Sequence, residues 1–132
     1  MRAKPEVRYV LDASAVLAYL QQEMGYEKVR EALEAGAVVS TVNLAEVYAK
    51  VIDKGLALEG VATRLKALGL SSLPVTEEDA RRSALLYPAA RTLGLSLADR
   101  VCLALALRLN LPALTADQGW REFGDVQVEL IR

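Results

Sequence analysis

Four acidic side chains differ from the other acids of this sequence because their neighbours along the chain are mostly apolar or uncharged. They are Asp12, Glu46, Asp99 and Asp117. A charge inside a segment of buried character needs a partner charge or a metal ion. Carboxylate oxygens are preferred ligands of hard cations such as Mg²⁺ and Mn²⁺. These four acids therefore predict a carboxylate metal site, whereas the acids within EKVREALE and EEDARR indicate solvated helix faces.

A simpler explanation exists for each acid taken singly, because helix N-termini select acidic and hydroxyl side chains. Asn43-x-x-Glu46 and Ser96-x-x-Asp99 both resemble capping boxes, and the other two acids are suitable N-cap residues. Glu46 could also pair with Lys50 one turn later. Capping does not explain why four such acids would gather at one edge of a sheet. The set favours the metal site.

Two hydroxyl side chains stand two residues away from acids of this set, in the segments D-A-S and T-A-D. They are Ser14, next to Asp12, and Thr115, next to Asp117. Each could orient a carboxylate or a water on the metal, and each could equally cap the following helix. Both interpretations stay open from the residues themselves.

The sequence has no histidine and a single cysteine, Cys102. Without histidine, Ser-His-Asp and Cys-His catalysis is excluded, and a zinc site has almost no ligands. One cysteine cannot form an internal disulfide, and no segment resembles a secretory signal or a membrane span, so we expect a cytoplasmic protein. The net charge of −1 is not typical of a protein that binds nucleic acid mainly by bulk positive charge.

Short apolar segments alternate with amphipathic ones along the whole chain, which indicates a parallel sheet covered by helices on both faces. The pattern predicts one domain over residues 1–132, a three-layer α/β/α fold with a central parallel sheet of four to five strands. The strands are expected at 7–11, 37–41, 71–76, 112–115 and 126–131. The helices are expected at 13–20, 26–36, 43–55, 58–68, 77–94 with a kink at Pro88, 97–110 and 116–124.

This arrangement brings the four acids to one edge of the predicted sheet. Asp12 follows the first strand, and Glu46 lies in the first turn of the helix after the second strand. Asp99 lies in the first turn of the nearly all-apolar helix before the fourth strand, and Asp117 lies just after that strand. Ligands of such folds bind at the carboxyl ends of the strands, so the acids are expected to converge there.

Four segments in this order carry a resemblance to a known family: YVLDASAVLAYL, STVNLAEVYAKV, LSLADRVCLALALRLNLP and ALTAD. The chain resembles the PIN-domain nucleases, most closely the VapC-type toxins of toxin–antitoxin pairs. The resemblance implies RNA as substrate, a metal site built from Asp12, Glu46, Asp99 and Asp117, and support from Ser14 and Thr115. It also implies a homodimer and an antitoxin protein as partner.

The expected function is a Mg²⁺- or Mn²⁺-dependent endoribonuclease that cleaves single-stranded or looped RNA. We assign Asp12 and Asp99 to direct ligation of the ion and Glu46 to ligation or to a role as general base. Asp117 is assigned to the outer side of this ion or to a second ion. One alternative is a Mg²⁺-dependent phosphatase or phosphotransferase with Asp12 as nucleophile, although Ser14 stands where such enzymes carry a second acid. The other alternative is a receiver-like interaction domain in which the acids only cap helices.

Overall fold

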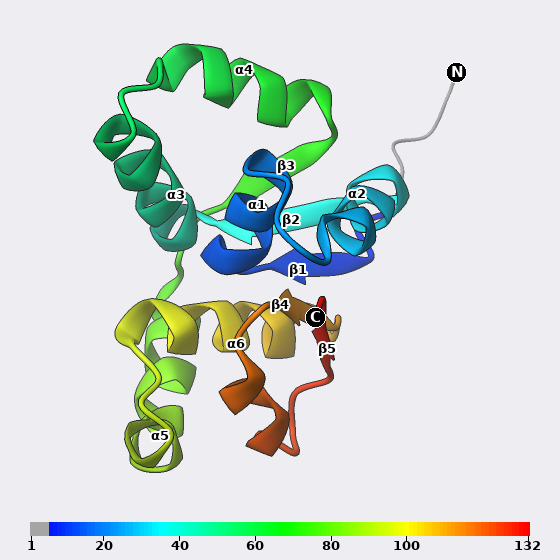
Figure 1. Cartoon of the computed structure of the whole chain (residues 1–132). Coiled ribbons are helices and arrows are strands. Elements are labelled where there is room, and N and C mark those ends of the chain that lie inside the picture. The colour runs from blue at the N-terminus through cyan, green and yellow to red at the C-terminus, as the bar shows by residue number, and fades with distance from the viewer. Residues whose placement is uncertain (1–5) are drawn as a thin grey trace.

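The computed structural model describes residues 6–132, which fold into one five-stranded parallel sheet with helices on both faces (Figure 1). The predicted three-layer architecture is confirmed. The strands are β1 (Tyr9–Leu11), β2 (Ala37–Ser40), β3 (Leu70–Leu73), β4 (Ala113–Thr115) and β5 (Val128–Leu130). The helices are α1 (Ala13–Leu20), α2 (Tyr26–Ala35), α3 (Thr41–Asp53), α4 (Leu58–Ala67), α5 (Glu77–Thr92), α6 (Leu97–Leu109) and the short 3₁₀ helix η1 (Gln118–Glu122).

Strand β1 lies at the centre of the sheet, whose strand order is β3-β2-β1-β4-β5. In the register, Leu11 pairs with Val39 of β2 on one side and with Leu114 of β4 on the other. Because all five strands are parallel, their carboxyl ends share one edge, and the residues that follow β1, β2 and β4 are neighbours in space.

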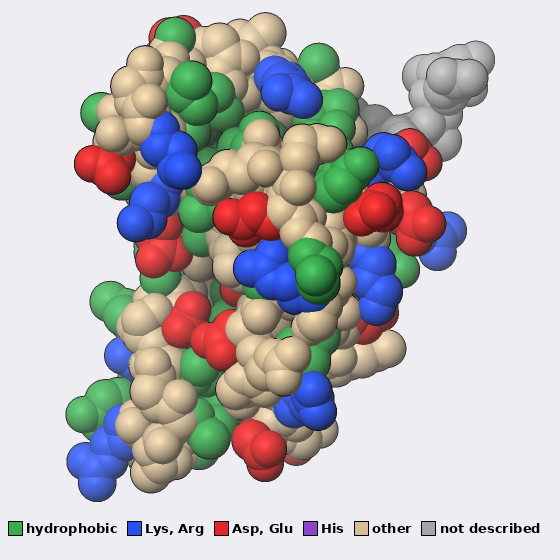
Figure 2. All heavy atoms as spheres, viewed as in Figure 1, with side chains coloured by type: hydrophobic (Ala, Val, Ile, Leu, Met, Phe, Trp, Pro, Cys, Tyr) green, Lys and Arg blue, Asp and Glu red, His purple; other side chains and the backbone are tan. Residues whose placement is uncertain are grey.

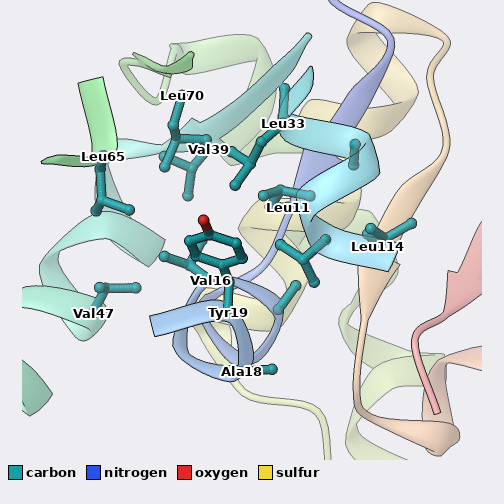
Figure 3. Close-up of a cluster of buried hydrophobic side chains, with 14 of the residues drawn as sticks. Leu11, Val16, Ala18, Tyr19, Leu33, Val39, Val47, Leu65, Leu70 and Leu114 are labelled. Carbon is teal, nitrogen blue, oxygen red and sulfur yellow. The ribbon is translucent and has the colours of Figure 1, made fainter. Parts of the chain in front are cut away.

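The alternation of side chains along the strands divides the core into two parts. Leu11, Val39 and Leu114 belong to the cluster under α1 to α4, whereas the preceding residues of the same strands, such as Val10, belong to the cluster under α6. In the first cluster the ring of Tyr19 lies between side chains from the sheet and the surrounding helices (Figure 3). Burial of both faces explains why these strands contain almost only apolar residues.

Helix α6 is the most buried helix, as its sequence predicts. Seven of its residues are buried, and it contacts β1, β2, β4 and the helices α3 and α5. Ser96 caps its N-terminus as expected, and Asn110 ends it in the left-handed conformation. This fixes the first turn of α6, which carries Asp99, at the carboxyl edge of the sheet.

Several sequence-based boundaries are wrong by a few residues, for identifiable reasons. Strand β1 begins at Tyr9 rather than at residue 7. Helix α3 begins at Thr41 rather than at Asn43, because the hydroxyl of Ser40 accepts the backbone N–H of Asn43 and so serves as the cap. Helix α5 runs through Pro88, as expected, and ends at Thr92 rather than at residue 94.

One acid that the sequence assigned to a solvated face is buried instead. Asp79, within EEDARR, is 1% exposed, and both its oxygens accept hydrogen bonds from the guanidinium of Arg108, at 2.8 and 3.1 Å. The partner lies 29 residues later on α6, so neighbouring charges in the sequence could not indicate it. Among the helices of residues 6–132, none has the length and apolar character that crossing a membrane requires.

Candidate functional site

Asp12 is the buried centre of the site. It follows β1 at the carboxyl edge and caps α1, where its Oδ1 accepts the backbone N–H of Ala15 at 2.8 Å. The hydroxyls of Ser14 and Thr115 also donate to its carboxylate, at 2.7 Å and 2.6 Å. The side chain is only 3% exposed, so its charge is held almost entirely by these hydrogen bonds.

Burial dominates the acidity of Asp12. It raises the pKa of this carboxyl from 3.8 to about 6, against the opposing effect of the hydrogen bonds from Thr115, Ala15 and Ser14. The negative charge of Asp99 contributes to the same rise. Three donors therefore do not offset the cost of burying this charge, and Asp99 lies near enough to add to that cost.

Thr115 and Ser14 connect the ends of β1 and β4. Thr115 is fully buried, and its hydroxyl donates to Asp12 while it accepts the backbone N–H of Asp117 at 2.9 Å. Ser14 likewise donates to Asp12 and accepts the backbone N–H of Ala116 at 3.0 Å. Both hydroxyls therefore orient the carboxylate of Asp12, and neither caps a helix.

Asn43 positions Glu46 against the start of α6. Its amide donates to Oε1 of Glu46 at 3.3 Å and to the backbone carbonyl of Ala98 at 3.2 Å, and its Oδ1 accepts the hydroxyl of Ser40 at 2.7 Å. Asn43 is 1% exposed, whereas Glu46 is exposed. The resemblance of Asn43-x-x-Glu46 to a capping box is therefore misleading, because Asn43 lies inside α3 and links it to α6.

Asp99 and Asp117 both make capping hydrogen bonds. Oδ2 of Asp99 accepts the backbone N–H of Ser96 at 2.9 Å, which completes a capping box. Oδ1 of Asp117 accepts the backbone N–H of Gly119 at 2.9 Å and so caps η1. Asp117 is exposed and Asp99 half-buried. The burial suggested by their apolar neighbours in the sequence holds fully only for Asp12.

The buried thiol of Cys102 is influenced by the charges of three of the four acids. It lies one turn after Asp99 on α6 and is fully buried. Burial raises the pKa of this thiol well above its ordinary value, and the charges of Asp12, Asp99 and Glu46 raise it further. The charges of three carboxylates from α1, α3 and α6 thus reach this thiol, and Thr115 links the backbone of Asp117 to Asp12. Because α3 begins at Thr41, Glu46 lies beyond its first turn and not within it as expected. Within residues 6–132, however, no three acidic, histidine or cysteine side chains are already clustered as ligands of one metal ion.

A family model for the PIN domain matches residues 9–126, from the start of β1 to just before β5. The chain belongs to the PIN-domain family. The match covers Asp12, Glu46, Asp99 and Asp117 together with the elements that hold them, in agreement with the resemblance that the sequence motifs carry.

Solved structures of similar fold cover nearly the whole of this PIN domain. DNA-bound VapBC from Salmonella typhimurium is 14% identical, with a TM-score of 0.73, 96% of this chain covered and 100% of that one. A toxin–antitoxin complex from Klebsiella pneumoniae is 17% identical, with a TM-score of 0.73 and coverage of 94% and 98%. VapBC-5 from Mycobacterium tuberculosis is 24% identical, with a TM-score of 0.57 and coverage of 96% and 99%.

At these identities the similarity concerns the fold. No curated protein matches the chain.

Two residues that position the site are not predicted by the sequence pattern. Ser40 and Asn43 hold the first turn of α3 and, through Ala98, connect it with α6. The available signal was an uncharged amide three residues before Glu46, in an otherwise apolar stretch of this PIN domain. The spacing of Asn43 and Glu46 resembles a capping box, and only the position of α6 reveals the second hydrogen bond of the Asn43 amide.

Proposed function

We propose that this PIN domain is a divalent-metal-dependent endoribonuclease that cleaves single-stranded or looped RNA. The observation that carries the proposal is Asp12, a buried carboxylate of raised pKa at the carboxyl edge of the sheet, with Asp99 and Glu46 close enough to act on the same buried thiol. Buried negative charge that hydrogen bonds leave partly uncompensated is what a cation at this edge would neutralise.

The donor set fits Mg²⁺ or Mn²⁺, because it consists of carboxylate oxygens without histidine or an available thiolate. Asp12 and Asp99 would hold the ion directly, Glu46 would ligate it or accept a proton from the attacking water, and Asp117 would act on the outer side or toward a second ion. Oδ2 of Asp99 accepts the N–H of Ser96, so Oδ1 is the oxygen that would contact the ion. When bound, such an ion polarises a phosphate and lowers the pKa of water.

The chain's own residues supply positioning. Ser14 and Thr115 hold both oxygens of Asp12 in fixed directions, and the amide of Asn43 holds Oε1 of Glu46. Preorganised orientation of ligands in this way commonly contributes 10- to 100-fold in metal affinity or activity. Cleavage by water would break the bond to the 3′ oxygen of the RNA and leave a 5′-phosphate.

The solved complexes of similar fold support a toxin role. One is described as a toxin–antitoxin complex and another as a member of the VapBC family of toxin–antitoxin systems. By analogy, we propose that this protein is the toxin of such a pair, that it forms a homodimer, and that an antitoxin protein is its partner. We also propose that it acts in the cytoplasm.

The alternative with Asp12 as a phosphoryl acceptor is less compatible with the geometry. Both oxygens of this carboxylate already accept hydrogen bonds, the side chain is 3% exposed, and Ser14 takes the place of a second acid. Trapping a phosphoryl group on Asp12 would establish that alternative. An interaction domain whose acids only cap helices would bind no divalent ion at these four side chains.

Cleavage of RNA by the purified protein, free of any partner, tests the proposal. We expect cleavage of single-stranded RNA in Mg²⁺ or Mn²⁺ and none in EDTA. Asp12→Asn or Asp99→Asn is expected to reduce the rate by at least ~100-fold, as loss of a metal ligand or its orientation does. Asp53→Asn is a matched control, since Asp53 is exposed at the far end of α3 from Glu46. Full activity of Asp12→Asn would refute the proposed site.

A further inference from the structure

The arginines of α5 and α6 fall into two groups. Arg81, Arg82 and Arg108 are ion-paired with Glu77, Glu78 and Asp79, at 3.2, 2.9 and 2.8 Å. For the other two, Arg91 and Arg100, the described part of the chain provides no carboxylate oxygen within 4.0 Å. These two guanidinium groups therefore carry positive charge that no neighbouring side chain neutralises.

Both unneutralised arginines converge on one aromatic ring, Tyr87. The guanidinium carbon of Arg100 lies 5.1 Å from the centroid of this ring, and that of Arg91 lies 5.9 Å from it. Tyr87 is 48% exposed, and Arg91 is exposed as well. Arg100 donates to the backbone carbonyl of Ser83 at 2.9 Å, while its buried Nε has no partner. The guanidinium of Arg100 is therefore only partly anchored.

The cluster of Tyr87, Arg91 and Arg100 adjoins Asp99 along the chain. Arg100 directly follows Asp99 in the first turn of α6, and the C-terminal part of α5 leads into that turn through residues 93–96. Helices α5 and α6 pack side by side (Figure 1). Figure 2 shows basic side chains, in blue, on the surface over α5 at the lower left. An RNA strand bound at Asp12 and Asp99 would thus need to extend only past the start of α6 to reach the cluster.

We propose that the cluster of Tyr87, Arg91 and Arg100 binds the single-stranded RNA that flanks the cleaved bond. A guanidinium matches the geometry of a phosphate, and the half-exposed ring can stack with an unstacked base once a guanidinium has turned from the ring to the phosphate. Because the chain has a net charge of −1, RNA must be held by a local basic site rather than by the overall charge. The inference rests on the proposed ribonuclease function and adds the residues that hold the substrate.

Binding of a fluorescently labelled single-stranded RNA in EDTA, measured by anisotropy over a range of salt concentrations, tests this site without cleavage. Arg91→Gln is expected to weaken binding and to lower the slope of log Kd against log salt by about 0.7, the value for one lost phosphate contact on a single strand. Arg81→Gln is the matched control, because it removes the same charge from the same helix at an ion-paired position. It should leave both the Kd and the slope unchanged.

Substitution of the ring tests the stacking. Tyr87→Leu is expected to raise the Kd by at least ~5-fold, the lower end of what loss of one base–aromatic stack produces, whereas Tyr87→Phe should bind as wild type does. A thermal melt of each variant checks folding. If Tyr87→Leu proves unstable, the salt slope of Arg91→Gln decides, since Arg91 is exposed and carries no ion pair in the described structure.

The outcomes separate this inference from the proposed function. If the wild type cleaves RNA but Arg91→Gln and Arg81→Gln bind it equally well, the cluster is not part of the RNA site. If the wild type neither binds nor cleaves RNA, the ribonuclease proposal fails and this inference fails with it. If Arg91→Gln changes only the oligomeric state in sedimentation while the Kd for RNA is unchanged, the surface is a protein interface and the proposal is overturned.

Discussion

Replacing Asp12 by Asn should stabilise the metal-free protein at pH 8, which is unusual for a buried, hydrogen-bonded side chain. Asn can still accept the N–H of Ala15, and the hydroxyls of Ser14 and Thr115 can rotate to accept from its amide. What the substitution removes is the ionised form, whose burial raises the pKa of Asp12 to about 6. An exposed residue that merely capped α1 would give a nearly neutral result.

The sign and size of the effect follow from that pKa. Because the pKa in the folded protein lies above the ordinary value of 3.8, Asp12 contributes fully to stability below pH 4, and its contribution falls as the pH rises through about 6. The difference corresponds to about 3 kcal/mol of lost stability once the group is ionised. Replacing three charge-assisted hydrogen bonds by neutral ones costs the variant roughly 0.7 kcal/mol each, about 2 kcal/mol in total, so a net gain of ~1 kcal/mol is expected at pH 8.

Thermal melts of wild type and Asp12→Asn at pH 4 and pH 8, in EDTA and in Mg²⁺, measure these quantities. At pH 8 in EDTA the variant should melt about 3 °C higher, and at pH 4 the difference should disappear or reverse. Mg²⁺ should stabilise the wild type by mass action, by about 2.7 kcal/mol at 100 times its Kd, and the variant much less. If the variant melts lower at pH 8 and Mg²⁺ shifts neither protein, the argument for a carboxylate cluster is refuted.

Two further predictions concern the stability contributed by Asp79 and the effect of the protein on cell growth. Burial by itself would raise the pKa of Asp79, but hydrogen bonds from Arg108 and Thr76 hold it below its ordinary value. Asp79→Asn should therefore destabilise the protein by about 2–3 kcal/mol at pH 7 in urea melts, less than for a fully buried pair because Arg108 is partly exposed. That loss should shrink toward pH 3, and an unchanged stability at pH 7 would contradict it. Expression of the protein without a partner should arrest growth, and Asp12→Asn should relieve the arrest; harmless expression of an active nuclease would instead favour an RNA-processing role.

The fold could be predicted because its signals are local and periodic. Buried parallel strands produce short apolar runs, and the nearly uniform apolar character of residues 97–110 indicated a helix inside the molecule, which α6 is. The errors lie where a tertiary contact decides. Asp79 is buried because Arg108 reaches it from another helix, and α3 begins at Thr41 because Ser40 provides the cap. Arg108 cannot be identified from the neighbours of Asp79 in the sequence, whereas Ser40 is a local cap that competes with Asn43 as the start of the helix.

The candidate site was predicted less completely than the fold. The order of the predicted elements placed Asp12, Glu46, Asp99 and Asp117 near one sheet edge, and in the structure the charges of the first three raise the pKa of one buried thiol. Composition could not indicate that Glu46 and Asp117 are exposed, since both stand among apolar neighbours in the sequence. The role of Asn43 depends on a carbonyl 55 residues away, which no local pattern encodes.

Helix capping and metal binding need not exclude one another at this edge of the sheet. In a parallel sheet each helix begins where a strand ends, so an acid that caps such a helix already lies where ligands bind. Asp117 caps η1 while exposed to solvent, which shows that capping here requires no burial. Asp12 caps α1 at 3% exposure, and its pKa of about 6 means that its capping bonds leave part of the cost of burial uncompensated. A bound cation would remove that remaining cost, so the effect of Mg²⁺ on stability, rather than the capping geometry, distinguishes a metal ligand from a cap.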